Sequence, residues 1–288
     1  LGASTINSAD FLPEARAMKV TPCIDDFSPD FRGKTLVLPG AGGIANLGEL
    51  CTDALITTYG LQRVAIVESA HLLPVAMVNA FGQTSPALTT AAEIYQAPTG
   101  DSPLTVLQLR SGAVEGRRWA LAQELLRWAK EVGVSTFLVL ASCSAHVKGD
   151  VDLAEASQLR ALSVRTSELP ELLPLGHGLS DAELNDGPGT ASAARQLLRG
   201  SGLARPLLEA AAEPQSPSSF APPSRVAPSV CCICGFTNET LDWRIPAQLV
   251  DAAAGYLSLP KTPLVQPPSW LLAQQAQLAP PSENLQLW

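Results

Sequence analysis

The stretch Lys34–Leu50, KTLVLPGAGGIANLGEL, joins a short apolar run to a glycine-rich turn. Residues 34–39 predict a buried strand, and residues 47 to about 59 predict a helix with Asn46 as N-cap and Gly60 just past its end. Gly40–Ala45 matches the G-x-G-x-x-A form of the dinucleotide-binding fingerprint, in which glycines let the backbone approach a pyrophosphate at a helix N-terminus. The alternative is a tight strand-to-helix turn without a ligand.

Two features weaken the dinucleotide interpretation. Pro39 stands where the last strand residue would normally pair, and Glu68, the candidate acid for a ribose hydroxyl, lies beyond the usual spacing of about 20 residues. An NAD-dependent oxidoreductase that uses Gly40–Ala45 stays as an alternative.

Strand and helix patterns alternate along the rest of the chain. Apolar runs predict strands at 63–69, 92–95, 104–109, 135–144 and 230–236. Periodic runs predict helices at 116–133 and 246–259. Residues 187–200 predict a Gly-Pro turn that leads into a short helix, and a further short helix is expected near Trp270. In the 116–133 helix, the predicted apolar face consists of Trp119, Ala122, Leu125, Leu126 and Ala129. Apolar strands that alternate with helices are typical of an α/β sheet covered on both faces. We expect a single three-layer α/β domain, formed by residues 18–208 and 230–272, with a mostly parallel or mixed central sheet.

Three segments are expected to lie outside this domain. Residues 1–17 are predicted to be a disordered extension, and residues 209–229, rich in proline and serine, a flexible insertion. Residues 273–288 are predicted to form a mobile C-terminal tail, to which a mobile segment at 260–268 would add reach.

Composition limits the classes of partner. The chain has 288 residues, with 19 Lys+Arg against 27 Asp+Glu and a formal net charge of −8, which argues against nucleic acid. No apolar run approaches the roughly 18 to 20 residues that span a bilayer, so we expect no membrane segment. We expect a cytoplasmic and nuclear protein whose six cysteines are reduced.

The sequence CCIC, Cys231–Cys234, has a Cys-x-x-Cys spacing that is compatible with half of a zinc site or a redox pair. A structural zinc site needs a second pair of ligands, and His71, His146 and His177 stand alone. The apolar neighbours of these cysteines favour a buried strand of small thiols. We therefore expect no metal and no cofactor.

The sequence ASCSAH, Ala141–His146, places Ser142, Cys143 and His146 at the end of a predicted strand, where α/β folds often hold active sites. A hydrolase that uses these residues is a further alternative. No G-x-S-x-G elbow is present, and a strand-end loop with polar caps explains the same residues.

The last residues of the sequence, NLQLW, follow a Pro-Pro-Ser spacer. If the carboxylate of Trp288 is free, this arrangement suits capture of a C-terminus in a pocket of a partner. A frayed terminus is the alternative.

Taken in order, the motifs resemble the proteasome assembly chaperone 2 family. The resemblance rests on MKVTPCIDDFSPDFRGKTLVLPG (18–40), IANLGELCTDALITTYGL (44–61), AAEIYQAP (91–98), VLQLRSG (106–112), the helix that holds Trp128 and FLVLASCS (137–144). Matches beyond residue 147 are fewer, and the insertion has no clear counterpart. Met18 aligns with the family's first residue.

The resemblance implies a chaperone without a chemical step. It implies pairing with proteasome assembly chaperone 1 and docking on the α subunits of the 20S proteasome, and it makes Gly40–Ala45 a structural turn. It also implies that Leu287 and Trp288 insert between α subunits, as hydrophobic-tyrosine-any tails do. This chain departs from that motif, because Gln286 and Leu287 occupy its first two positions.

Overall fold

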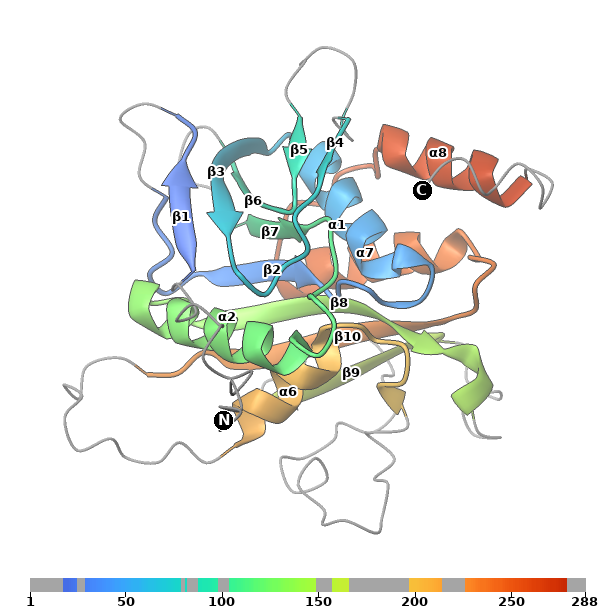
Figure 1. Cartoon of the computed structure of the whole chain (residues 1–288). Helices are drawn as coiled ribbons and strands as arrows, with labels where there is room; N and C mark the ends of the chain where they lie inside the picture. Colours follow the sequence, from blue (N-terminus) through green and yellow to red (C-terminus); the bar gives the residue numbers. More distant parts are fainter. Residues whose placement is uncertain are drawn as a thin grey trace, which may run out of the picture.

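A twisted sheet of eight strands forms the centre of the molecule (Figure 1). The computed structural model describes residues 18–24, 29–78, 81, 88–97, 104–148, 157–165, 197–213 and 226–278. Within them the strand order is β1-β3-β6-β7-β2-β8-β10-β9. The strands span Lys19–Pro22 (β1), Thr35–Pro39 (β2), Gln62–Glu68 (β3), Ala92–Gln96 (β6), Thr105–Leu109 (β7), Thr136–Ser144 (β8), Leu159–Val164 (β9) and Ser229–Thr237 (β10). A separate two-stranded sheet pairs β4 (Ala76–Met77) with β5 (Thr89–Thr90).

The sheet is mixed. Its four central strands, β7, β2, β8 and β10, run parallel to one another, whereas β1, β3 and β6 on one side and β9 on the other pair antiparallel. The parallel strands are mostly apolar and are buried over nearly their whole length, because helices cover both of their faces. The expectation of an α/β fold with a mixed sheet is confirmed.

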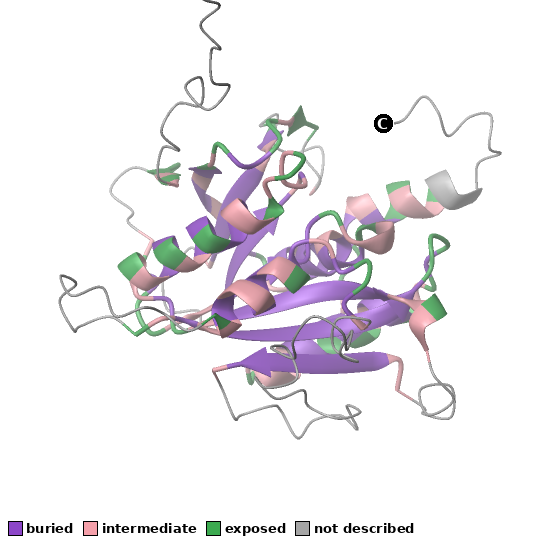
Figure 2. Cartoon of the chain, turned by 60° about the horizontal axis from the view of Figure 1, so that its bottom comes forward, coloured by how far each residue is buried: buried purple, intermediate pink, exposed green. Residues whose placement is uncertain are grey.

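Helices form the two outer layers. On one face, α2 (Arg118–Val132) and α6 (Ala204–Ala212) cover a core that includes Phe137, Val139 and Leu162. On the other face, α1 (Leu47–Thr58), α7 (Arg244–Tyr256) and α8 (Pro268–Leu278) cover Val37, Leu138 and Leu140. Figure 2 shows the sheet as a buried layer between helices that are exposed only on their outer sides. None of the helices in the described part is both long and apolar enough to cross a bilayer.

Two local predictions need correction. Asn46 precedes α1, but its backbone is left-handed (φ 50°) and its side chain makes no capping hydrogen bond. Gly60, in contrast, lies just past the helix with φ 60°, as predicted. In α2 the buried face includes Leu121 and Trp128, whereas the predicted Trp119 is only half-buried. The Trp128 ring packs edge-on against Phe31, with 5.3 Å between the ring centroids.

Helix α8 crosses the predicted limit of the domain at residue 272. The segment before it makes specific contacts with the end of α1. The Tyr59 hydroxyl donates to the Pro260 carbonyl (3.1 Å), and the Val265 N–H donates to Thr58 Oγ1 (3.0 Å). Four predicted segments lie wholly or partly outside the described residues: the extension at 1–17, residues 214–225 of the insertion, residues 187–196 of the predicted turn and short helix, and the tail from residue 279.

Candidate functional site

The glycine turn lies at the carboxyl end of β2, between the ends of β7 and β8. The chain leaves β2 at Pro39, forms a short 3-10 turn at Ile44–Asn46 and enters α1 on one face of the sheet. After β7 the chain enters α2 on the opposite face. Such a reversal is the place where open α/β sheets usually bind ligands.

In this protein the chain's own backbone occupies that place. The Ile44 N–H donates to the Gly200 carbonyl (3.0 Å), and the Leu203 N–H donates to the Ala41 carbonyl (3.1 Å). The Ser144 N–H, at the end of β8, donates to the carbonyl of Arg199 (3.1 Å). We call residues 198–203 the plug. These bonds join the plug to the turn that follows β2 and to the end of β8.

Glycine is required where the plug meets the turn. A Cβ added to Gly40 would lie 2.6 Å from the Ser201 carbonyl oxygen, and one added to Gly43 would lie 2.6 Å from Ser142 Oγ. A Cβ on Gly202 would lie 2.3 Å from the carbonyl oxygens of Gly40 and Ala41. The glycines of the fingerprint therefore allow backbone to pack on backbone rather than on a pyrophosphate.

Glu49 supplies a carboxyl group to the same turn. Its Oε1 accepts the Gly42 N–H (3.0 Å), while Oε2 is buried without a hydrogen-bond partner among the described residues. Burial raises the pKa of the Glu49 carboxyl to about 7, against the opposing effect of the bond from Gly42. The Glu49 side chain thus already accepts the Gly42 N–H that a phosphate on the turn would need.

The geometry gives no support to the NAD alternative. The N–H groups of Gly42 and Ile44 already donate to protein oxygens. Glu68 ends β3, which stands three strands from β2, and its carboxylate lies 3.5 Å from Lys19 Nζ. At about 4.8 Å per strand, that separation removes Glu68 from any ligand on the turn.

The hydrolase candidates do not converge. Ser142 is buried, and its Oγ donates to the Gly200 carbonyl (2.7 Å), so this serine holds the plug. Cys143 points into the core on the α2 side of the sheet, whereas His146 is exposed on a 3-10 turn at Ala145–Val147. These three residues therefore do not form a pair of nucleophile and base.

The CCIC segment forms the buried strand β10, as its apolar neighbours predicted. Cys231 faces the α7 side of the sheet, and Cys232 and Cys234 face the α2 side, because successive side chains of a strand alternate. The Cys-x-x-Cys pair, Cys231 and Cys234, therefore cannot hold one metal. The part of the chain that the structure describes contains no group of three metal-ligating side chains.

Three of these thiols form a cluster. Interaction with the neighbouring thiols of Cys143 and Cys232 lowers the pKa of the Cys234 thiol. Burial raises the pKa of the Cys143 thiol well above its ordinary value. All three lie in the core, so reagents in solution have no direct path to them.

A buried polar network beneath α1 escaped the sequence analysis. The Arg110 guanidinium forms two hydrogen bonds with the Asp53 carboxylate, at 2.5 and 2.7 Å. Gln108 Nε2 donates to the same carboxylate (2.5 Å), and its Oε1 accepts from Thr52 (2.7 Å). The network connects the middle of α1 to β7 and to Arg110 just after it. The one sequence signal for it is that these polar residues alternate with apolar ones.

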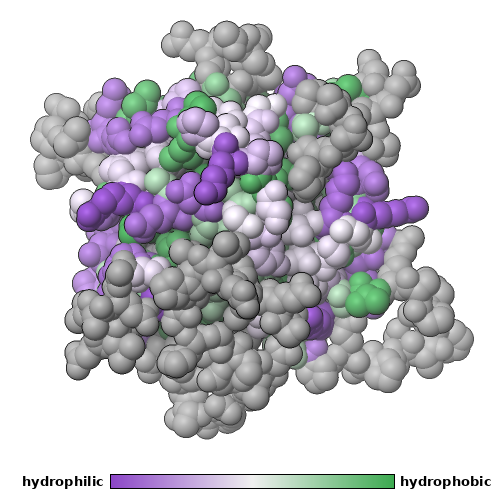
Figure 3. Space-filling model, turned by 180° about the vertical axis from the view of Figure 1, so that it is seen from behind, coloured by the Kyte–Doolittle hydropathy of each residue, from purple (hydrophilic) through white to green (hydrophobic). Residues whose placement is uncertain are grey.

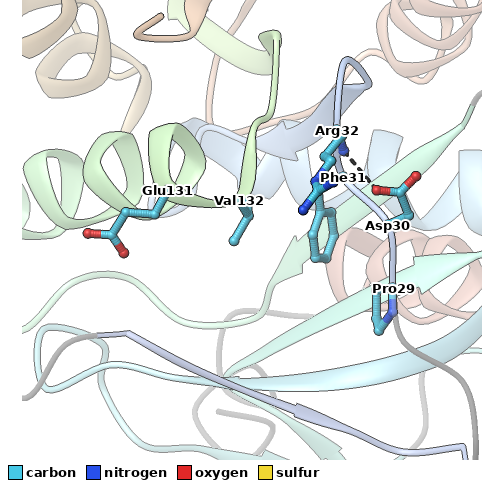
Figure 4. Close-up of a pocket in the computed structure, with 6 residues that line it drawn as sticks. All are labelled: Pro29, Asp30, Phe31, Arg32, Glu131 and Val132. Carbon is cyan, nitrogen blue, oxygen red and sulfur yellow. Dashed lines mark hydrogen bonds between the residues drawn. The ribbon is translucent and has the colours of Figure 1, made fainter. Parts of the chain in front are cut away.

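A surface hollow of about 330 Å³ lies at the other end of β2 (Figure 4). It is lined by Pro29, Asp30, Phe31, Arg32, Glu131 and Val132. The Arg32 N–H donates to Asp30 Oδ1 (3.1 Å), and the Phe31 ring is already packed on Trp128. The hollow lies at the opposite end of β2 from the plug, and its lining includes no serine, cysteine, lysine or histidine.

A family model described as the PAC2 family matches residues 37–207, which is more than half of the chain. The chain belongs to the PAC2 family. This confirms the resemblance that the ordered motifs indicated. The matched region runs from β2 through the plug into α6 and so includes the whole glycine turn.

Known relatives agree with this assignment. The chain is 30% identical over 135 residues to the Homo sapiens protein named proteasome assembly chaperone 2, covering 46% of this chain and 50% of that protein. It is 32% identical over 153 residues to the Nematostella vectensis protein of the same name, covering 51% and 61%. The chain thus spans about half the length of the curated relatives it matches.

A solved structure shares the fold. Pyrococcus furiosus PbaA, described as an archaeal homolog of proteasome-assembly chaperone, matches with a TM-score of 0.55 at 13% identity. The match covers 91% of this chain and 95% of PbaA. At this identity the likeness concerns the fold alone.

The C-terminal part of this PAC2-family chain is fixed to the body at Trp270. Its side chain is 1% exposed, its indole N–H donates to the Leu50 carbonyl (2.9 Å), and its ring packs against Trp243. The tail residues Leu287 and Trp288 lie outside the described residues.

Figure 3 shows the molecule from behind, where hydrophobic residues of the described part are interspersed with hydrophilic ones.

Proposed function

We propose that this chain is a proteasome assembly chaperone that acts by binding and without a chemical step. The observation that carries the proposal is the 30–32% identity to proteins named proteasome assembly chaperone 2, within a match to the PAC2 family. The glycine turn supports it, because the protein's own backbone fills the place where an α/β enzyme would bind its ligand.

In the proposal, the chain pairs with proteasome assembly chaperone 1 and promotes formation of the α-ring of the 20S proteasome. It acts in the cytoplasm and the nucleus. The resemblance of its motifs to the family supports the pairing. The partner-facing surface has no sequence signature, since interfaces of this kind are about as apolar as the rest of a protein surface.

The tail is proposed to dock between α subunits through Leu287 and Trp288. Where Trp288 carries the free carboxylate, that group would form a charge-assisted bond with a lysine in the α-subunit pocket. Helix α8 supports this role, because Trp270 fixes its start to α1. The ten residues after Leu278 can span up to about 35 Å when extended.

The test is an affinity purification of the full chain with a tag on its N-terminus, followed by mass spectrometry. We expect a proteasome assembly chaperone 1 homologue and 20S α subunits, with few mature β subunits. A chain that recovers neither would contradict the proposal.

The tail is tested separately by deleting Leu287 and Trp288. We expect the α subunits to be depleted while the chaperone partner is retained. If the partner is lost as well, the tail belongs to the pairing interface and the docking role is wrong. Equal recovery of α subunits from both forms would also contradict docking.

A further inference from the structure

Helices α2 and α6 begin at the same end of the sheet. Helix α2 leads into β8, α6 precedes β10, and β8 and β10 are parallel neighbours. Both helices pack on the same face, in contact with each other, so both of their N-termini lie at the carboxyl end of these strands (Figure 1).

Four arginines occur at this end of the molecule. Arg117 is the N-cap residue of α2, Arg118 is its first residue, and Arg205 is the second residue of α6. Arg199 belongs to the plug, and its carbonyl is bonded to the end of β8. Three of the four are exposed and Arg117 is half-buried. We call these four residues the arginine patch.

Positive charges of the arginine patch lie at helix N-termini, where the helix dipole is unfavourable for cations. A helix N-terminus favours acidic side chains and disfavours cations, by about 0.3–1 kcal/mol for each charge. Neither α2 nor α6 has an acidic residue in its first turn. The sequence therefore accepts a cost in stability at both helix ends.

Few carboxylates of the described residues neutralise the patch. Arg205 forms an exposed ion pair with Glu209 at 3.0 Å. Within the described residues no carboxylate forms an ion pair with Arg117, Arg118 or Arg199. Glu115 is exposed nearby in sequence and offsets one of the charges.

From this charge arrangement we propose that the arginine patch binds an acidic segment of a protein partner. Arginine suits carboxylates, because its planar guanidinium donates two parallel hydrogen bonds to them. The formal charge of −8 for the whole chain opposes a long polyanion such as RNA but leaves room for a short acidic segment. The inference does not rest on the proteasome role.

The test uses the full chain and a fluorescein-labelled peptide of ten glutamates, with fluorescence anisotropy at low salt. We expect saturable binding that weakens as salt is added, since exposed charge pairs are screened. Arg118→Glu and Arg199→Glu should each weaken binding roughly three- to fivefold, and the double variant about tenfold or more.

Arg127→Glu is the matched control. Arg127 is exposed on α2 but lies toward the opposite end of that helix, so the variant makes the same charge change outside the patch. It should leave the affinity for the peptide within about 1.5-fold of the original, because only the charges nearest the peptide contribute strongly. The urea midpoint of unfolding is measured for every variant, so that a loss of binding can be distinguished from a loss of folding.

Three outcomes would overturn the inference. The first is absence of peptide binding by the original chain. The second is equal weakening by Arg118→Glu and Arg127→Glu, which would make binding a matter of overall charge. The third is equal or tighter binding of a ten-nucleotide poly-uridine RNA, which would make the patch a nucleic-acid surface.

Discussion

Gly202 shows how a single residue joins the plug to the glycine turn. Its φ of 59° lies in the left-handed region, and an added Cβ would meet two carbonyl oxygens at 2.3 Å. An L side chain here thus faces backbone strain and steric overlap together. Sequence analysis noticed the glycines at 40–43 but had no reason to connect them with one about 160 residues later.

Gly202→Ala should lower the free energy of unfolding by roughly 2 to 5 kcal/mol, because strain and overpacking add. Gly60→Ala is the control, since Gly60 has nearly the same φ and nothing within 4 Å of its Cβ position. That change should cost about 1 to 2 kcal/mol. Urea unfolding followed by circular dichroism measures the free energy of unfolding of both variants. Equal losses of that free energy would mean that Gly202 does not pack closely against the carbonyl groups of the glycine turn.

Glu49 should make stability depend on pH. Its folded pKa, about 7, lies above the ordinary value of 4.5, so the folded state binds the proton more tightly than the unfolded state. Its contribution is therefore complete below about pH 4.5 and is lost as pH rises to about 7. The full shift corresponds to about 3 kcal/mol.

Glu49→Gln should remove this dependence and retain an acceptor for the Gly42 N–H. The measurement is urea unfolding of both proteins at pH 5, 6, 7 and 8, with the exposed residue change Glu131→Gln as control. We expect the variant to gain stability relative to the original chain between pH 5 and 7. A constant difference over this range would show that Glu49 is charged in the folded state at pH 5.

The cysteines differ sharply in exposure. Cys23 is exposed and the other five are buried. With 5,5′-dithiobis(2-nitrobenzoic acid), the native chain should show about one fast thiol and six after denaturation, because buried thiols are shielded from reagents. Cys23→Ser should abolish the fast phase. Rapid reaction of any thiol in that variant would mean that one of the five buried cysteines is accessible to solvent.

At the scale of elements, Trp270 fixes α8 to α1. Trp270→Ala should cost about 3–5 kcal/mol, because it removes a large buried ring and leaves a cavity. Trp270→Phe keeps most of the ring and loses the bond to the Leu50 carbonyl, for about 1 kcal/mol. Leu271→Ala is the control, because Leu271 is 51% exposed and should change stability by less than about 0.5 kcal/mol. Equal effects at 270 and 271 would mean that α8 does not pack on α1 in solution.

Elements set by local pattern could be predicted from the sequence. The strands near residues 34–39, 135–144 and 230–236 are continuous apolar runs, and each was found within one or two residues of its place. The sheet order could not be predicted, because β10 lies beside β8 through contacts about 90 residues apart. Asn46 failed as a cap for a different reason: the 3-10 turn before α1 puts its backbone in a left-handed conformation.

The same limit applies to the candidate site. The turn itself was visible in the sequence, and so were its two interpretations. What decided between them was the plug and the carboxylate of Glu49, which only the folded chain brings to Gly40–Ile44. The buried pair of Asp53 and Arg110 was missed, since single charges within apolar segments resemble solvent-facing positions.

At the scale of the whole molecule, the later segments complete the sheet and both helical layers. A chain shortened to residues 1–165 keeps β8 but loses β10, α6, α7 and α8. We expect it to be largely unfolded or aggregated, because apolar faces on both sides of the sheet lose their cover. Circular dichroism and gel filtration test this. As a control, residues 214–225 are replaced with a Gly-Ser linker of equal length, and this full-length variant should keep the native fold. If the 1–165 fragment is compact and unfolds cooperatively, residues 1–165 form an independent domain.

The hydrogen bond between Leu50 and Trp270 can form only late in translation. The two residues are 220 positions apart. At about 5–20 residues per second, a ribosome needs roughly 10 to 45 s to add the second after the first. Throughout that interval the apolar side of α1 lacks the helices that finally cover it. A nascent chain of this family is therefore itself a candidate client for ribosome-associated chaperones until its last helices emerge.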